Sequence, residues 1–207
     1  MKTGRASHEL GKGSCALALV LLFFLCSPLV PLAAALDSKS TVESLIKLFS
    51  QWGTGVNNQT FAAQAAQFID YRTMSQMALG ADNWGKLSEA QRQEFTQSFR
   101  TLVEKRYYPR WHKIFSKSRI TYGKESVQNG LTRIQTQITL KDSVQQVNWE
   151  LKAEGSEPKV VNLSVEDKDL VMRVGRRFQK KLTQSGFPAL LAWIKTQAAK
   201  SGSTSED

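Results

Sequence analysis

Residues 131–152 read LTRIQTQITLKDSVQQVNWELK, and the alternation of side chains in this stretch sets the fold class. The positions on one side are Ile134, Thr136, Ile138 and Leu140 in the first half and Val147, Trp149 and Leu151 in the second. Alternation of this kind is typical of strands with one buried face. Lys141-Asp142 separates the halves and is typical of a turn. The stretch therefore predicts two antiparallel strands.

The alternation of apolar and polar side chains extends on both sides of this stretch, over residues 119–165. Asn129-Gly130 comes before the quoted stretch and is a strong signal for a hairpin turn. A further turn signal lies at 155–158, and Val161, Leu163 and Val165 then alternate with polar residues. Four consecutive strands joined by short turns predict an antiparallel meander with one face in water.

Helical spacing precedes the strands, in residues 40–114. Ser88 and Gln91 have the spacing of a capping box, in which the serine hydroxyl and the glutamine amide close the first turn of a helix. Pro109 predicts that this helix ends or kinks there.

Helical spacing returns in residues 170–199, where Gly186 breaks the pattern and Pro188 starts a final helix. Helices, then a meander, then helices predict an α+β domain. In such a domain the helices pack on one face of the four-stranded antiparallel sheet.

The first 35 residues are typical of a secretory signal peptide. They combine a positively charged start, an apolar run at 15–25 and small residues at Ala33 and Ala35. We expect cleavage after Ala35 and export to the periplasm of a bacterium. Two alternatives are an uncleaved membrane anchor and a lipoprotein lipidated on Cys26. The apolar run is shorter than a spanning helix needs, and Leu25 occupies the place where a lipobox has a small residue.

Cleavage would leave a single domain at 36–199 and a tail at 200–207 whose small polar residues predict disorder. Cys15 and Cys26 are the only cysteines, so the mature chain would have no thiol. The whole chain has a formal net charge of +10. A basic exported protein could bind anionic membrane surfaces or acidic proteins, or the charge could serve solubility alone.

The sequence contains no catalytic motif that we can identify, neither a nucleophile elbow nor a P-loop, a zinc-protease helix or a dinucleotide fingerprint. His112 is the one histidine outside the leader, and a lone histidine near a helix end is typical of a surface or packing residue. We therefore expect no enzyme activity, no cofactor and no metal. Large apolar side chains are abundant instead, and composition does not tell whether they form a solid core or line a pocket.

The order and spacing of several segments resemble the MlaC, or toluene-tolerance, family. The segments are 68–70, Met74, 78–80, Trp84, 87–102, 160–165, 174–178 and 186–190. Members of that family are periplasmic auxiliary proteins of an ABC transport system for phospholipids. Asn162 stands where the family usually has an aspartate.

The resemblance implies a half-open cone, in which helices and a curved sheet enclose an apolar pocket for the acyl chains of a phospholipid. It implies a monomer that shuttles lipid between an inner-membrane ABC transporter with an MCE-domain subunit and an outer-membrane lipoprotein complex, and that binds no nucleic acid. Two other readings stay open. One is a carrier of another apolar ligand, such as a hopanoid or hydrocarbon, and the other is a non-catalytic periplasmic adaptor with a filled core.

The resemblance and the apolar stripes together predict the residues of the pocket. They are Met74, Met77, Phe95, Phe99, Leu102, Tyr107, Ile134, Ile138, Val147, Trp149, Leu163, Val174 and Phe178. A basic cluster at the start of the last helical segment predicts a surface for docking of partners, made of Arg173, Arg176, Arg177 and Lys180.

Overall fold

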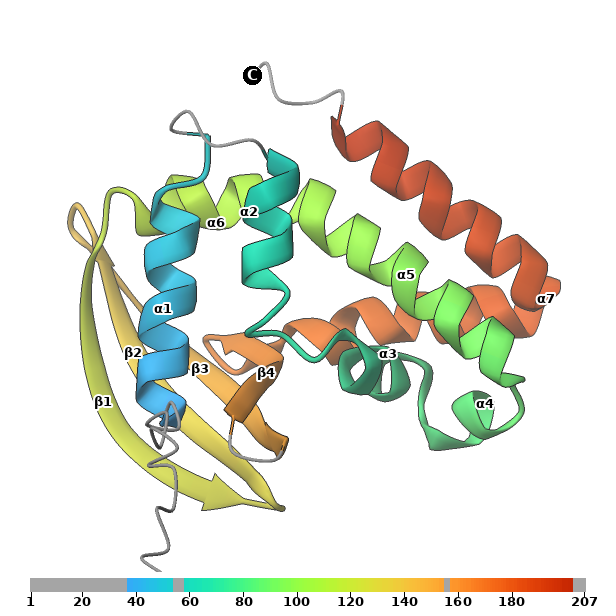
Figure 1. Cartoon of the computed structure of the whole chain (residues 1–207), viewed down its shortest axis with the longest axis horizontal. Helices are drawn as coiled ribbons and strands as arrows, with labels where there is room; N and C mark the ends of the chain where they lie inside the picture. The colour runs from blue at the N-terminus through green and yellow to red at the C-terminus, as the bar shows by residue number, and fades with distance from the viewer. Residues whose placement is uncertain (1–36, 54–57, 155–156, 203–207) are drawn as a thin grey trace, which may run out of the picture. The chain divides into compact units, whose positions relative to one another are not determined.

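The structure is a computed structural model, and it describes residues 37–53, 58–154 and 157–202 (Figure 1). The expected signal peptide, residues 155 and 156 of the third turn and the end of the tail lie outside the described residues. Within the described ranges, no helix combines the length and hydropathy needed to cross a membrane.

Helices lie at both ends of the described chain and the strands lie between them. The first group is α1 (Ser38–Ser50), α2 (Asn58–Ala65), α3 (Tyr71–Leu79), α4 (Ala81–Gly85), α5 (Glu89–Arg106) and α6 (Tyr108–Phe115). The strands are β1 (Arg119–Gln128), β2 (Leu131–Leu140), β3 (Ser143–Glu154), β4 (Glu157–Val165) and β5 (Lys168–Asp169), and α7 (Leu170–Gly202) follows them. This order confirms the predicted α+β class. Helix α7 continues past residue 199, where the sequence predicted that the domain ends.

The strands form one antiparallel sheet in the order β1-β2-β3-β4-β5 (Figure 1). Asn129 and Gly130 join β1 to β2 with positive φ angles of 54° and 75°, as the predicted hairpin requires. The prediction of four strands was wrong by one. The short β5 follows a turn at Glu166 and Asp167, both in the left-handed region with φ angles of 47° and 61°. That turn contains no glycine, so the sequence lacked the usual signal for it.

One face of the sheet is buried beneath helices. Ile134, Thr136 and Ile138 in β2 are at most 3% exposed, whereas Gln137 between them is exposed. Helix α1 packs on β2 and β4 and lies across the inner side of the curved strands (Figure 1). Helices α3 and α7 pack on β4. The predicted arrangement, with helices on one face of a curved sheet, is thus confirmed.

A β-bulge in β4 changes which of its residues face the core. Glu150 pairs with Asn162 and Leu151 pairs with Val160, so Val161 has no partner in β3. The other edge of β4 is held at Val160, whose amide donates to Phe68 O at 2.9 Å and whose carbonyl accepts from Asp70 N at 3.0 Å. The alternation in the sequence placed Val161 on the same face as Leu163, and the bulge places Val160 there instead.

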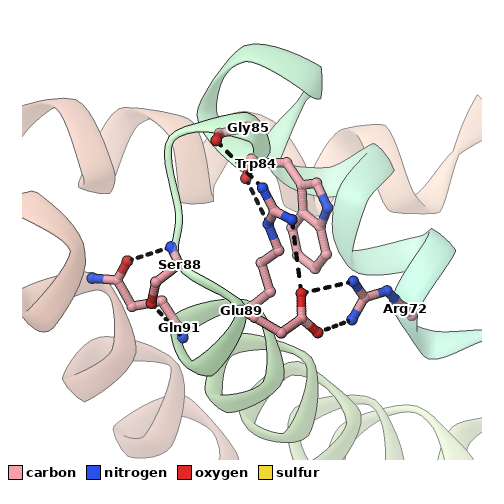
Figure 2. A network of polar contacts seen from close by, with 7 residues as sticks. Arg72, Trp84, Gly85, Ser88, Glu89 and Gln91 are labelled. Carbon is pink, nitrogen blue, oxygen red and sulfur yellow. Dashed lines mark hydrogen bonds and ion pairs between the residues drawn. The ribbon is translucent and has the colours of Figure 1, made fainter.

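Polar contacts fix the start of α5 against α3 and α4 (Figure 2). The predicted capping box is present, because Gln91 N donates to Ser88 Oγ at 3.2 Å and Ser88 N donates to Gln91 Oε1 at 2.9 Å. Arg72 of α3 donates to both carboxylate oxygens of Glu89, at 2.7 and 3.0 Å. Because Arg72 and Glu89 are each 52% exposed, this pair contributes more to orientation than to stability.

Helix α7 packs closely on α3 and then bends. A Cβ atom added to Gly175 would lie 2.4 Å from the backbone oxygen of Ala78, so only glycine fits at this crossing. The bend is at Gly186, where φ is 76° and ψ is 174°. The sequence predicted this break, and the two halves of α7 that it separates both belong to the helical layer (Figure 1).

Candidate ligand-binding pocket

An apolar pocket lies between the sheet and the helices. Its lining comes from α1, α3, α5, α6, β3, β4 and α7, and consists of Leu45, Ile69, Met74, Phe99, Val103, Tyr107, Trp111, Trp149, Val160, Asn162, Leu163, Leu170, Val171 and Val174. The empty space is about 530 Å³, counting the part that is open to solvent.

Trp149 forms part of the sheet side of the pocket and is 1% exposed. Its indole nitrogen donates to Thr136 Oγ1 at 3.0 Å, and the Thr136 hydroxyl donates to Val147 O at 3.2 Å. The indole N–H is therefore satisfied within the sheet, and the rest of the ring offers apolar surface to the pocket.

Asn162 is the one amide side chain among the lining residues that the structure describes. Its Nδ2 donates to Glu150 Oε2 at 3.0 Å and to Asp169 Oδ2 at 2.7 Å, and its Oδ1 accepts from Leu163 N at 2.8 Å. These bonds occupy both ends of the amide, so Asn162 holds two carboxylates together without offering a polar group to a ligand. The pocket is therefore suited to an apolar ligand, or to the apolar part of one.

A second cavity adjoins the first at Tyr107, Leu170 and Val174, which line both. Its empty space is about 580 Å³, again including open solvent. The other lining residues are Arg106, Arg110, Arg173 and Arg177. The apolar pocket thus has a strongly basic cavity as its neighbour.

A model of the MlaC protein family matches residues 53–196, which is more than half of the chain. The chain belongs to the MlaC family. No curated protein sequence matches it significantly.

The fold of this MlaC-family chain is similar to that of a solved structure from Ralstonia solanacearum. That structure is a phospholipid-binding protein in complex with a phospholipid. The two share 14% sequence identity with a TM-score of 0.68, over 81% of this chain and 98% of the other. At this identity the similarity establishes the fold.

Six of the thirteen side chains predicted for the pocket line it in this MlaC-family protein. They are Met74, Phe99, Tyr107, Trp149, Leu163 and Val174. Their role in binding stays a prediction.

The other seven predicted residues do not line this pocket. They are Met77, Phe95, Leu102, Ile134, Ile138, Val147 and Phe178, and apart from the half-buried Met77 all are at most 3% exposed. Phe178 shows the reason: its ring lies 5.6 Å from that of Phe95 and 5.4 Å from that of Phe99, both at nearly right angles. Edge-to-face rings at these distances fill the space between α5 and α7.

Eight lining residues were not predicted. They are Leu45, Ile69, Val103, Trp111, Val160, Asn162, Leu170 and Val171. The apolar stripe of 42–49 could have suggested Leu45, since it lies at helical spacing between Val42 and Phe49. Val160 was missed because the bulge that turns it inward has no signal in the sequence.

The four residues predicted to dock partners all lie exposed on α7. Arg173 and Arg177 line the basic cavity. Arg176 lies with Arg173 at a separate hollow that also contains Asp167 and Asp169. The predicted surface is thus divided between two places, and its docking role stays a prediction.

Two titratable hydroxyls are buried outside the pocket. Tyr71 of α3 and Tyr108 of α6 share a short hydrogen bond, and burial raises the pKa of both hydroxyls above that of ordinary tyrosine. The neighbouring Tyr108 raises the pKa of Tyr71 further, while the bond to Tyr71 partly opposes the effect of burial on Tyr108. The pair links α3 to α6 and does not reach the pocket lining.

The remaining candidates for chemistry have structural roles. His112 contacts the carbonyl oxygen of Phe49 through Nδ1 at 3.1 Å, which ties α6 to α1. Over the described ranges, no group of three or more His, Cys, Asp or Glu side chains could hold a metal ion.

Proposed function

We propose that this MlaC-family protein is a periplasmic phospholipid shuttle, which carries lipid between the inner and outer membranes as part of an Mla-type ABC transport system. The observation that supports it most is the apolar pocket, whose one described amide side chain is hydrogen-bonded at both ends and which adjoins a cavity lined by arginines. The complex of the Ralstonia solanacearum protein with a phospholipid, on a similar fold, supports the same ligand. In this proposal the protein catalyses no reaction and only binds and releases lipid.

The physics of transfer agrees with this role. Burial of apolar chain is worth about 0.8 kcal/mol per methylene, so two acyl chains carry a gross cost of roughly 20 kcal/mol or more if they enter water unprotected. A lipid that moves from a bilayer into an apolar pocket exchanges one dry environment for another. The net free energy of that exchange is small, which allows the carrier to load at one membrane and unload at the other.

The partners follow from the family. We propose docking to an inner-membrane ABC transporter complex with an MCE-domain subunit and to an outer-membrane lipoprotein complex. The exposed cations on α7 are one surface for such contacts, and Lys180 and Arg176 are the members that do not line the basic cavity. Binding through them would weaken as salt rises, because exposed charges are screened.

Mass spectrometry of the protein purified from a periplasmic extract tests the proposal. The expected result is a mature chain that begins at Leu36 and a bound diacyl phospholipid, released on denaturation and confirmed by phosphorus analysis. A bound hopanoid or hydrocarbon would replace the proposed ligand with another apolar one. A compact protein without bound lipid, which also fails to take up lipid from vesicles, would contradict the proposal and favour an adaptor with a filled core.

A further inference from the structure

Arginines from three helices surround the cavity that adjoins the apolar pocket. Arg106 ends α5, Arg110 lies in α6, and Arg173 and Arg177 lie one turn apart in α7. Arg106 is half-buried and the other three are exposed. Because this cavity shares lining residues with the apolar pocket, the four arginines gather beside that pocket.

The positive charge at this cavity is not neutralised by an ion pair among the described residues. Several arginines elsewhere pair with carboxylates, as in Arg72–Glu89, Arg100–Glu104 and Arg133–Glu150. By contrast, the guanidinium groups of the four arginines of the cavity form no hydrogen bond or ion pair with any residue that the structure describes, and none of the described residues that line the cavity is acidic. A concave surface with charges of one sign concentrates its field on an anion.

The chemistry of guanidinium groups suits a phosphate group. Their planar N–H groups match the oxygens of phosphate and can donate two parallel hydrogen bonds to it. Tyr107, Leu170 and Val174 belong to both cavities, so an anion beside the arginines would be a short reach from chains in the apolar pocket. A phosphate that is joined to acyl chains fits both cavities at once.

We infer that Arg106, Arg110, Arg173 and Arg177 bind the phosphate group of the lipid whose acyl chains occupy the apolar pocket. This inference rests on the proposed function and adds a determinant of ligand class to it. The site selects phospholipids over uncharged diacyl lipids and does not depend on the alcohol attached to the phosphate. Because three of the four arginines are exposed, the contribution is moderate and is screened by salt.

The test compares two lipids with the same acyl chains, a phosphatidylglycerol and a diacylglycerol, binding to delipidated full-length mature protein. Arg110→Gln with Arg177→Gln removes two guanidinium groups from two helices. Lys113→Gln with Arg119→Gln is the matched control, because both residues are exposed, line neither cavity and change the net charge equally. Thermal unfolding verifies that both double variants are folded.

We expect the Arg110/Arg177 variant to lose about tenfold in affinity for phosphatidylglycerol and to keep its affinity for diacylglycerol. The control variant should match the wild type for both lipids. Unchanged affinity for phosphatidylglycerol, or an equal loss for both lipids, would overturn the inference while leaving the proposed function intact. Wild-type protein that binds neither lipid would overturn the proposed function itself. If the double variant does not fold, the affinities of the wild type for the two lipids decide the question, because equal affinities would refute phosphate recognition.

Inorganic phosphate separates a lipid head group from a free anion. We expect phosphate alone to bind the delipidated wild type far more weakly than phosphatidylglycerol, because it lacks the apolar contribution. Tight binding of inorganic phosphate, with no competition against lipid, would identify a free-anion site and overturn the inference. A variant that keeps its lipid affinity but no longer associates with an acidic protein would assign the arginines to docking instead.

Discussion

The pocket and the neighbouring aromatic core are both apolar, and Phe99 belongs to each, yet only one of them is hollow. In the core, the ring of Phe178 meets those of Phe95, Phe99 and Trp193 edge to face, with centroids 5.4 to 6.1 Å apart. Toward the pocket, Phe99 shares its surroundings with the short side chains of Val103, Val160 and Val174. The comparison teaches that three rings meeting edge to face around Phe178 fill the space between α5 and α7, whereas a wall that mixes rings such as Trp111 and Trp149 with shorter side chains from separate elements leaves space.

The largest expected effect is on the filled side. Phe178→Ala should lower the free energy of unfolding by about 3–5 kcal/mol, because it leaves a cavity among three rings. Val174→Ala lies one turn away on the same helix and is the matched change on the pocket side. It should cost less than about 1 kcal/mol, since the removed methyl groups face space that is already empty. Chemical denaturation of both variants measures the difference, and equal losses would show that the two regions pack alike.

A second effect concerns the close contact between the backbones of α7 and α3. Gly175→Ala would place its Cβ 2.4 Å from Ala78 O and 3.0 Å from Ala78 Cα, so α7 and α3 must move apart. We expect a loss of about 1–3 kcal/mol or more. Gly85→Ala is the control, because its Cβ would meet nothing within 4 Å. A Gly175→Ala variant as stable as the control would mean that the helix crossing is loose.

These contrasts also show how far the sequence could lead. The fold class followed from alternation in 131–152, and local signals such as Asn129-Gly130, the capping box at Ser88 and the break at Gly186 each agree with the structure. Such features depend on neighbours in the chain, so a sequence carries them directly.

The pocket depends on contacts that the sequence does not show. Phe95 and Phe99 lie four residues apart on the same helix, and only Phe99 lines the pocket, because the ring of Phe178 from α7 closes the space beside Phe95. The bulge at Val161 and the glycine-free turn before β5 likewise depend on how the strands pair, which residue type alone does not reveal. Residue type therefore gave the apolar character of the region, and tertiary packing decided which side chains border its empty space.

A third effect concerns the buried hydrogen bond between the hydroxyls of Tyr71 and Tyr108. Burial raises the pKa of Tyr71 and Tyr108, so the folded state holds these protons more tightly than the unfolded state does. The two protonated hydroxyls therefore make a contribution to the free energy of unfolding that is fully present below pH 10, the ordinary tyrosine pKa. This contribution is lost as the pH rises above that value, by at most about 1.4 kcal/mol per pH unit for each hydroxyl.

The double variant Tyr71→Phe with Tyr108→Phe should therefore lose less stability than the wild type between neutral pH and pH 11. Tyr107→Phe, at the pocket, is the control with one hydroxyl removed outside this pair. The measurement is the unfolding midpoint against pH. An identical alkaline decline in the double variant and the wild type would show that the buried pair does not titrate as the structure requires.

The smallest expected effect on stability accompanies the most direct test of lipid binding. Val174→Trp places a large ring in the wall of the pocket, where the ring competes with the lipid for the same space. Because Val174 is half-buried, we expect a cost of about 1 kcal/mol, the low end of the range for overpacking. Val144→Trp makes the same exchange at a residue that is 58% exposed and lines neither cavity. The measurement is the phospholipid phosphorus bound per folded protein, purified identically for both variants and the wild type. We predict that Val174→Trp stays folded and loses its lipid while Val144→Trp keeps the wild-type amount. A folded Val174→Trp protein that carries as much phospholipid as the wild type would contradict the assignment of this pocket.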